Sequence, residues 1–329
     1  EIASCLVGSE MCIRDRSYAS ATTMQPFRFH SIYQPRIWGG QSMRTMLGRE
    51  LPDRETAYGE AWEISDRPEA MSIVKDGEWE GMSLHRLWEE HRQEIFGPGY
   101  ERFPRFPLLC KILDARENLS VQVHPPERTA AARQGEVKNE IWYVLHASPD
   151  ALIYGGMKEN ATLPDIRHAA ETGQMEQLIR STHLEPGEHL YIPAGLVHAI
   201  GAGHLIAEIQ QNSDTTYRLY DWNRTDDSGR GRELHLEQAL DSIGEFRELC
   251  QRPGYLTEMP HFTTKEYRLD KGERFTQPDS SRFAVFTILC GSVLWDGKTA
   301  RKGEFILSPA GANAVTSAEA ETVLLSTTV

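Results

Sequence analysis

Length, composition and charge exclude several classes of protein before any motif is considered. The chain has 329 residues, of which 40% are hydrophobic and 25% charged, and this ordinary globular composition excludes a disordered, collagen-like or low-complexity protein. Its 35 Lys and Arg residues against 48 Asp and Glu residues give a formal net charge of −13. Because such a surface repels polyanions and anionic lipid, we expect no nucleic-acid and no membrane partner, although a local basic cluster can still bind a small anion.

The cysteines indicate a reducing environment. They are widely spaced, and none belongs to a C-x-x-C pair of the kind that binds zinc or exchanges disulfides. The five are Cys5, Cys12, Cys110, Cys250 and Cys290. We therefore expect a cytoplasmic protein, in which a metal site would be built from histidine and carboxylate side chains.

Residues 1–23 differ in character from the rest of the chain. They lack a periodic apolar pattern, and they lack the basic, apolar and small-residue regions of a signal peptide. Within them, the run CLVGSEMCIRDR resembles a translated sequencing-adapter tract. The prediction is a non-native or disordered leader, with Met24 as the natural start of the protein.

After Phe27 the chain consists mainly of short β-branched and aromatic runs that end at Gly, Pro, Asn or Asp, a pattern typical of a β-sandwich or barrel. Three amphipathic helices are expected to interrupt the strands, and Ser83 is placed to cap the first of them. The helical positions are Leu84, Leu87, Trp88, His91 and Ile95 in the first helix, the residues that begin near Pro164 in the second, and Leu236, Ala239, Leu240 and Ile243 in the third.

Residues 119–125 alternate strictly between apolar and polar side chains. A pleated strand with this sequence sends Ser120, Gln122 and His124 to one face and the apolar side chains to the other. An edge strand that faces solvent would show the same alternation. The functional interpretation therefore depends on which other polar residues share the site.

Two later segments supply further candidate ligands. Glu140 opens an otherwise apolar run and shares a face with Lys138, while His198 lies among apolar neighbours in the run GLVHAI. Taken alone, Glu140 could form a surface ion pair and His198 could be a neutral core histidine. Together with Gln122 and His124, they provide two imidazoles, one carboxylate and one amide oxygen, a set that suits a catalytic zinc with one position left for water or substrate.

A faint internal repeat indicates a duplicated β unit. The spacing Gly187-x5-Pro193-x-Gly195-x2-His198 recurs as Gly303-x5-Pro309-x-Gly311-x2, but the second copy ends on Ala314 where the first has a histidine. This spacing resembles the second signature of cupins, in which Gly and Pro mark the turns between jelly-roll strands. We expect two β-barrel-like halves, of which only the first can bind a metal.

The segment from His204 to Trp222 is unusually rich in polar residues for a strand, a turn and a second strand. Glu208 shares a face with Gln210 in the first arm, and Thr216, Arg218 and Tyr220 share a face in the second. Residues 212–214 supply the turn. A solvated hairpin with a surface Glu–Arg pair is the alternative to a functional site.

These motifs, in this order, resemble the type I phosphomannose isomerases in their short bacterial form, a family of the cupin superfamily. The resemblance extends over nearly all of the chain after Met24. It rests on IWGG at 37–40, GEAWEI at 59–64, KILDA at 111–115, SVQVHP at 120–125, Lys138 with Glu140, residues 195–198, and EIQQNSDTTYR at 208–218.

The resemblance implies a cupin scaffold that interconverts D-mannose 6-phosphate and D-fructose 6-phosphate. In the family, the Gln and His of the Q-x-H pair, a downstream Glu and a later His hold one zinc, which implies Gln122, His124, Glu140 and His198 here. It makes Arg218 an essential active-site cation and makes Lys138 and Glu208 proton-handling or orienting residues. It places Lys111 and Ser120 near the substrate phosphate.

The base that moves the proton between C1 and C2 stays open at this point. Glu208 is the natural carboxylate candidate, Lys138 would need a depressed pKa, and a metal-bound hydroxide is the third candidate. Whether zinc stabilises the enediolate charge or chiefly orients the sugar hydroxyls is open as well.

For domain organisation, we expect residues 24–250 to form the catalytic cupin domain with its helical segments, and residues 251–329 a smaller degenerate cupin-like β domain without metal. The protein is expected to be a monomer or homodimer. Two other functions are considered. A metal-dependent sugar-phosphate sensor without catalysis could dispense with Arg218, Lys138 and Glu208, and an iron oxygenase would fit poorly with a Gln ligand.

Overall fold

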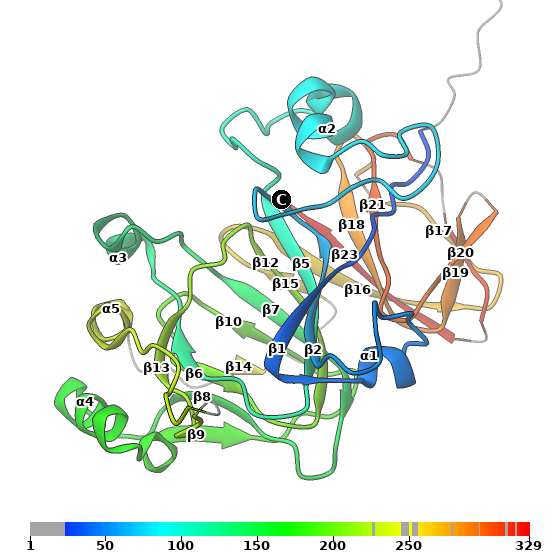
Figure 1. Ribbon diagram of the computed structural model, residues 1–329. Coiled ribbons are helices and arrows are strands. Elements are labelled where there is room, and N and C mark those ends of the chain that lie inside the picture. The colour runs from blue at the N-terminus through cyan, green and yellow to red at the C-terminus, as the bar shows by residue number, and fades with distance from the viewer. Residues whose placement is uncertain are drawn as a thin grey trace, which may run out of the picture.

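The computed structural model describes residues 24–225, 228–244, 250–251, 256–277, 279–295, 297–312, 315–319 and 321–329. The predicted leader 1–23, with Cys5 and Cys12, lies outside the described residues, as does Ala314 of the second repeat copy. The described chain is mainly β, with antiparallel pairing throughout, which confirms the expected fold class (Figure 1).

The larger part of the fold is a barrel of two facing antiparallel sheets. In spatial order, the first sheet contains β1 (Ile32–Gly40), β2 (Tyr58–Ile64), β5 (Leu108–Ala115), β12 (His204–Gln211), β7 (Glu140–Ala147), β10 (His189–Ile192) and β14 (Cys250–Gln251). The second contains β13 (Tyr217–Tyr220), β6 (Val121–Val123), β11 (His198–Ile200), β8 (Ile153–Met157) and β9 (Ile179–Thr182). β3 (Asp66–Arg67) and β4 (Ala70–Met71) form a separate pair.

Both faces of the first sheet are covered, which explains why its central strands read as nearly continuous apolar runs. Successive side chains alternate between the faces. On β12, Leu205, Ala207 and Ile209 belong to the outer core that extends to the C-terminal strands. Ile206 packs in the inner core between the two sheets, and Glu208 has the same parity and faces the same interior.

The three expected helices are present as α2 (Leu84–Glu90), α4 (Leu163–Thr172) and α5 (Leu236–Ser242). The described residues also contain two four-residue helices, α1 (Ser42–Thr45) and α3 (Glu127–Ala130). Ser83 caps α2 by accepting a bond from the Arg86 amide. The helix ends earlier than the apolar spacing suggests, because Ile95 lies in a π-helical turn over Arg92–Phe96. Further one-turn 3-10 segments are Ala131–Arg133 and Met175–Gln177.

The helices cover different parts of the β body (Figure 1). α4 and α5 pack on the outer face of the second sheet, where Ile166 and Leu240 join a core with Val121 and Val123. α2 lies beside the C-terminal strands instead, since Trp88 belongs to the outer core of the first sheet. Neither group of helices enters the space between the sheets, so that interior is lined by strands and loops.

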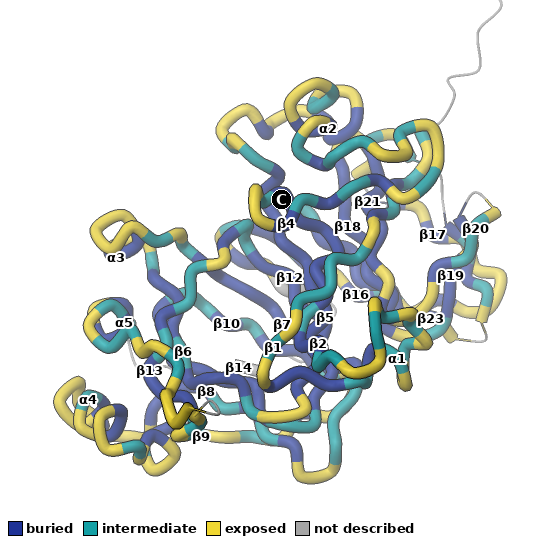
Figure 2. The backbone as a smooth tube through the Cα atoms, viewed as in Figure 1, coloured by how far each residue is buried: buried dark blue, intermediate teal, exposed yellow. Residues whose placement is uncertain are grey.

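Residues after 255 build two further antiparallel sheets. One contains β15 (Leu256–Glu258), β16 (Thr263–Asp270), β23 (Glu321–Thr328), β18 (Ala284–Cys290) and β21 (Phe305–Ser308). The other contains β17 (Arg274–Phe275), β22 (Val315–Ser317), β19 (Ser292–Trp295) and β20 (Lys298–Arg301). Trp295 and Phe286 lie in the core between them. The outer core shared with the barrel includes Val285 of β18 and Leu325 of β23. Figure 2 shows the buried strands of the first barrel sheet next to the buried strands of the C-terminal part.

The two copies of the sequence repeat adopt the same local structure. Gly187, Gly195, Gly303 and Gly311 all have positive φ, at 95°, 91°, 82° and 75°, a conformation that favours glycine. Each copy places a four-residue strand, β10 or β21, between its two glycine turns. The repeated spacing therefore marks equivalent turns in the two halves.

Candidate active site and metal centre

Three separate segments bring Gln122, His124, Glu140 and His198 into the space between the two barrel sheets. Gln122 lies in β6 and pairs in register with His198, the first residue of β11. Glu140 opens β7 in the facing sheet. His124 follows β6, and its carbonyl accepts a hydrogen bond from the Gly195 amide at 2.8 Å. Residues far apart in the sequence therefore face one another across the barrel.

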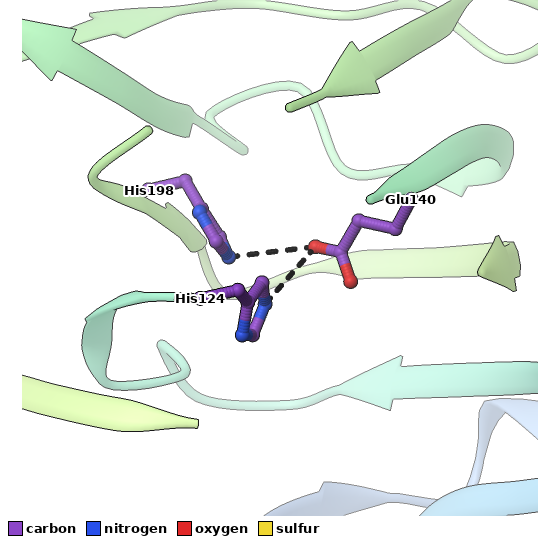
Figure 3. A group of neighbouring side chains, drawn as sticks. All are labelled: His124, Glu140 and His198. Carbon is purple, nitrogen blue, oxygen red and sulfur yellow. Dashed lines mark ion pairs between the residues drawn. The ribbon is translucent and has the colours of Figure 1, made fainter. Parts of the chain in front are cut away.

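The carboxylate of Glu140 faces both imidazoles, which lie next to each other (Figure 3). Its Oε1 is 3.5 Å from His124 Nε2 and 3.4 Å from His198 Nε2. Gln122 extends the group, since its amide nitrogen lies 3.4 Å from His198 Nε2. His124, Glu140 and His198 are fully buried, and their ligand atoms lie within 4.8 Å of one another.

The hydrogen bonds of this group fit a metal cation. His124 Nδ1 donates to the Thr215 carbonyl at 2.9 Å and His198 Nδ1 to the Leu196 carbonyl at 2.8 Å, so both rings direct the Nε2 lone pair toward Glu140. His124 Nε2 and Glu140 Oε1 are buried without a hydrogen-bond partner among the described residues. Unpaired buried donors and acceptors are rare, and a bound cation would satisfy both atoms.

The protonation states of the group are those that a metal needs. Burial, and after it the neighbouring His124, lowers the pKa of His198 to about 3. Burial and the Lys138 ammonium also lower the pKa of His124. Burial favours the neutral form of Glu140, but Lys138 and His124 outweigh it and hold the pKa of that carboxyl well below its usual range. The site therefore offers two neutral imidazoles and one carboxylate.

Lys138 holds the carboxylate from the other side. Its Nζ lies 2.9 Å from Glu140 Oε2, and both side chains are almost fully buried. Burial opposes the charge on this lysine, but the carboxylates of Glu140 and Glu208 outweigh it and raise the pKa of Lys138 above its usual value. Lys138 is therefore an ammonium ion at neutral pH.

Glu208 is a buried carboxyl whose protonation changes near neutral pH. Burial, and then the negative charge of Glu140, raise the pKa of Glu208 to about 7. Its Oε2 accepts a hydrogen bond from the Trp142 indole at 3.0 Å, and that indole packs against the His198 ring with centroids 5.4 Å apart. Glu208 is thus held by a rigid aromatic side chain next to Gln122, His124, Glu140 and His198, which we call the metal group.

A cavity of about 330 Å³ opens beside these residues. It is lined by Arg36, Trp38, Glu60, Lys111, Leu113, Leu119, Ser120, Gln122, Lys138, Glu208, Asp214, Thr216, Arg218 and Arg232. The cavity joins the metal group to most of the residues that the sequence singled out. Its size and mixed polar lining suit a small, charged substrate.

Lys111 lies on β5 and is surrounded by carboxylates. Its Nζ is 3.7 Å from Glu60, 4.0 Å from Glu208 and 3.4 Å from Asp214, and it also lies over the Trp62 ring at 4.5 Å. Burial favours a neutral Glu60, but Lys111 and Arg36 outweigh it and lower the pKa of Glu60 to about 2. Lys111 is therefore the centre of an ion-pair network rather than an isolated cation.

Arg218 lies directly beside the metal group. On β13 it pairs in register with Gln122 of β6, so the two side chains are neighbours on one face of the sheet. Its Nη1 donates to the Glu233 carbonyl at 2.7 Å. Burial and the nearby Arg232 lower the pKa of Arg218. Among the described residues, no carboxylate lies within ion-pair distance of this guanidinium.

The arrangement around β12 and β13 differs from the predicted strand-turn-strand in two respects. The two strands belong to facing sheets and do not pair with each other, so residues 212–216 cross from one sheet to the other. A register shift between Arg218 and Tyr220 turns Tyr220 into the core with Val121, while Thr216 and Arg218 line the cavity. The prediction that Tyr220 shares their face is wrong, because alternation fails at a β-bulge.

Several residues that support the site were not singled out from the sequence. Asn139 accepts hydrogen bonds from the Tyr191 hydroxyl and the Ala194 amide, both at 2.9 Å, and thereby ties the turn before His198 to the start of β7. Trp142 orients Glu208. Side chains alternate along β7, so Trp142 lies on the same face as Glu140. That alternation is the sequence feature from which a role for Trp142 in the site could have been predicted.

Comparisons with known proteins agree with this geometry. A family model described as "Phosphomannose isomerase type I, catalytic domain" matches residues 26–151. The mannose-6-phosphate isomerase of Streptococcus mutans is 36% identical over 301 residues, which cover 87% of this chain and 92% of the relative. Mannose-6-phosphate isomerase ManA of Bacillus subtilis is 43% identical over 225 residues, or 67% of this chain and 69% of the relative.

The chain belongs to the type I phosphomannose isomerase family. This confirms the resemblance inferred from the motifs, and it makes the chain an aldose–ketose isomerase of sugar phosphates. The mannose 6-phosphate isomerase structure from B. subtilis matches 93% of this chain and 100% of its own, with a TM-score of 0.81 at 29% identity. Phosphomannose isomerase structures from Salmonella typhimurium share the fold, with TM-scores of 0.70 to 0.71 at 16% identity.

Two further findings concern membrane-spanning helices and metal binding in this type I phosphomannose isomerase. No helix in the described part of the chain is both long enough and apolar enough to cross a bilayer. Among the described residues, His124, Glu140 and His198 are the one group of three or more His, Cys, Asp or Glu side chains close enough together to hold a metal. This buried group in the barrel is therefore the candidate metal site.

Proposed function

We propose that this chain catalyses the reversible isomerisation of D-mannose 6-phosphate and D-fructose 6-phosphate at one zinc ion. The observation that carries the proposal is the buried group of His124, Glu140 and His198, with unpaired ligand atoms, beside a cavity that Gln122 and Lys138 line. Two neutral imidazoles and one carboxylate are a common set of ligands for catalytic zinc. Gln122 would supply the fourth ligand through its amide oxygen, because a turn of the amide exchanges its nitrogen and oxygen.

The reaction moves a hydrogen between C1 and C2 of an open-chain sugar, so it needs a base for the carbon-bound proton and positive charge for the enediolate. We assign the base to Glu208, whose pKa of about 7 lets it accept and return a proton near neutral pH. Lys138 is unsuited to that role, because Glu140 and Glu208 keep it protonated. A bound zinc would supply Lewis-acid stabilisation of negative charge or would orient the sugar hydroxyls.

The remaining residues hold the substrate and its charge. We assign Arg218 the role of an active-site cation, since its half-buried side chain lies beside Gln122 and has no carboxylate partner among the described residues. Lys138 keeps Glu140 ionised and contributes positive charge near the reacting carbons. Lys111 and Ser120 line the same cavity and are assigned to substrate binding.

At the level of the whole chain, we propose residues 24–250 as the catalytic unit and residues 251–329 as a packing unit without metal. The outer core that both units share supports a structural role for the second. We further propose a monomer or homodimer that works in the cytoplasm, in keeping with the negative net charge and the scattered cysteines.

The decisive experiment is an isomerase assay on mannose 6-phosphate, coupled to detection of fructose 6-phosphate, combined with metal analysis of the purified protein. We expect about one zinc per chain, turnover in its presence, and loss of turnover after chelation that zinc restores. Binding of metal and sugar phosphate without turnover would instead support a sensor and contradict the proposal. A different metal with full activity would contradict only the assignment of zinc.

A further inference from the structure

The segment 232–235 lies against β13 and fixes the position of Arg218. The His235 amide donates to the Arg218 carbonyl at 2.8 Å, and the Arg218 amide donates to His235 Nδ1 at 3.2 Å. The Glu233 carbonyl accepts from the Arg218 guanidinium at 2.7 Å. These bonds hold segment 232–235 next to Arg218, which lines the cavity, so a side chain of the segment can line the cavity as well.

Arg232 is the cavity-lining side chain of this segment. Asp221, at the end of β13, accepts from its Nε at 2.7 Å and from its Nη2 at 2.5 Å. Asp221 is 5% exposed and also binds the Arg224 guanidinium. Arg232 is therefore held in a fixed orientation, and its Nη1 makes no hydrogen bond to any other residue that the structure describes.

The two sides of the cavity differ in charge. On the side of the first sheet, the cavity-lining cations Arg36, Lys111 and Lys138 are matched by the carboxylates of Glu60, Glu140, Glu208 and Asp214. On the side of β13, Arg218 and Arg232 line the cavity. Asp221 pairs with Arg232 and also with Arg224, which is not part of the cavity lining. The excess of positive charge therefore lies at the side of β13.

We propose that Arg232 binds the phosphate group of the substrate beside Arg218, and that Asp221 is the positioning residue that holds it there. The inference rests on the proposed function and deepens it by naming the side of the cavity that takes the phosphate. Guanidinium groups match phosphate because their planar donors form two parallel hydrogen bonds with its oxygens. Segment 232–235 thus supplies the phosphate ligand Arg232 and also holds Arg218 in position.

The test is Arg232→Gln in the full-length, metal-loaded protein. A lost hydrogen bond between charged groups should raise KM for mannose 6-phosphate by roughly 10–100-fold, and it should weaken inhibition by inorganic phosphate to the same extent. The bound metal should stay unchanged, and kcat should change much less than KM. Unchanged KM and phosphate inhibition in this variant would overturn the proposal.

Matched variants separate binding from folding. Arg230→Gln removes an exposed arginine two residues earlier, outside the cavity, and should keep the wild-type KM. Asp221→Asn keeps every arginine but loosens Arg232, so KM should rise while kcat changes less. Arg232→Lys keeps the charge and should fall between wild type and Arg232→Gln. A KM in Arg230→Gln that rises as much as in Arg232→Gln would overturn the assignment.

The inference can also be tested without turnover. Calorimetric titration of the wild type and Arg232→Gln with inorganic phosphate measures anion binding alone. If the wild type does not isomerise mannose 6-phosphate, the proposed function fails, while weaker phosphate binding by Arg232→Gln would still support the anion site. Equal phosphate binding by the two proteins would overturn the site, whatever the wild type catalyses.

Discussion

Gln122 and His198 occupy paired positions on the adjacent antiparallel strands β6 and β11. Because Arg218 pairs with Gln122 from the other side, the proposed active-site cation and two proposed metal ligands form one row across the second sheet. Glu140 faces this row from the opposite sheet, 3.4 Å from His198. The distance between the sheets therefore sets the size of the candidate metal site.

Replacement of metal ligands should remove metal and activity together. We expect Gln122→Leu to weaken metal binding by at least the roughly 10–100-fold that loss of an outer-shell partner causes, because Gln122 would contact the metal directly. His124→Ala and His198→Ala should lose bound metal altogether. Metal analysis after dialysis, with turnover on the same samples, checks both. His183→Ala, which alters an exposed histidine, should keep its metal, and full activity in a metal-free ligand variant would contradict the assignment.

Arg218→Ala should separate metal binding from catalysis. The arginine is beside the metal group but is not one of its ligands, so the variant should retain zinc. Removal of a preorganised positive group that faces developing negative charge should reduce kcat by roughly 10²–10³-fold. Steady-state kinetics and metal content on one preparation decide the matter. Near-normal kcat would show that Arg218 is not the active-site cation.

Much of the fold could be read from the sequence because local signals and tertiary packing agree there. Ser83 and the apolar spacing after it predict α2, and the paired glycine turns at 187 and 303 predict equivalent strands. Strict alternation in residues 119–125 predicts the side of β6 on which Gln122 lies. In these segments one local rule determines which way each side chain points.

The sequence was less informative where orientation depends on distant elements. Tyr220 lies in the core because of a register shift between β13 and β6, which no local pattern reveals. The charge state of Lys138 depends on Glu140 and Glu208, which the fold brings beside it. Arg232 reaches the cavity only because Asp221 and the bonds to β13 hold it there. Such effects arise from pairs of residues far apart in the chain.

Removal of the metal should lower stability as well as activity. A ligand that binds only the native state stabilises it by about 3 kcal/mol when its free concentration is about 100 times Kd. Without metal, His124 Nε2 and Glu140 Oε1 stay buried and unpaired. Chelation should therefore lower the thermal unfolding midpoint, and added zinc should restore it. A midpoint that does not respond to chelator would mean that the buried group binds no metal.

Glu208→Gln should stabilise the metal-free protein at high pH. Burial raises the pKa of Glu208 to about 7, above the 4.5 of an unfolded chain, so the wild type loses stability as pH rises from about 4.5 through 7. Glutamine keeps an acceptor for the Trp142 indole and removes the charge. The unfolding free energy of Glu208→Gln, relative to that of the wild type, should increase by roughly 2–3 kcal/mol between pH 5 and pH 8. Urea unfolding at both pH values measures this, with the exposed Glu78→Gln as control, and a difference independent of pH would contradict the assigned pKa.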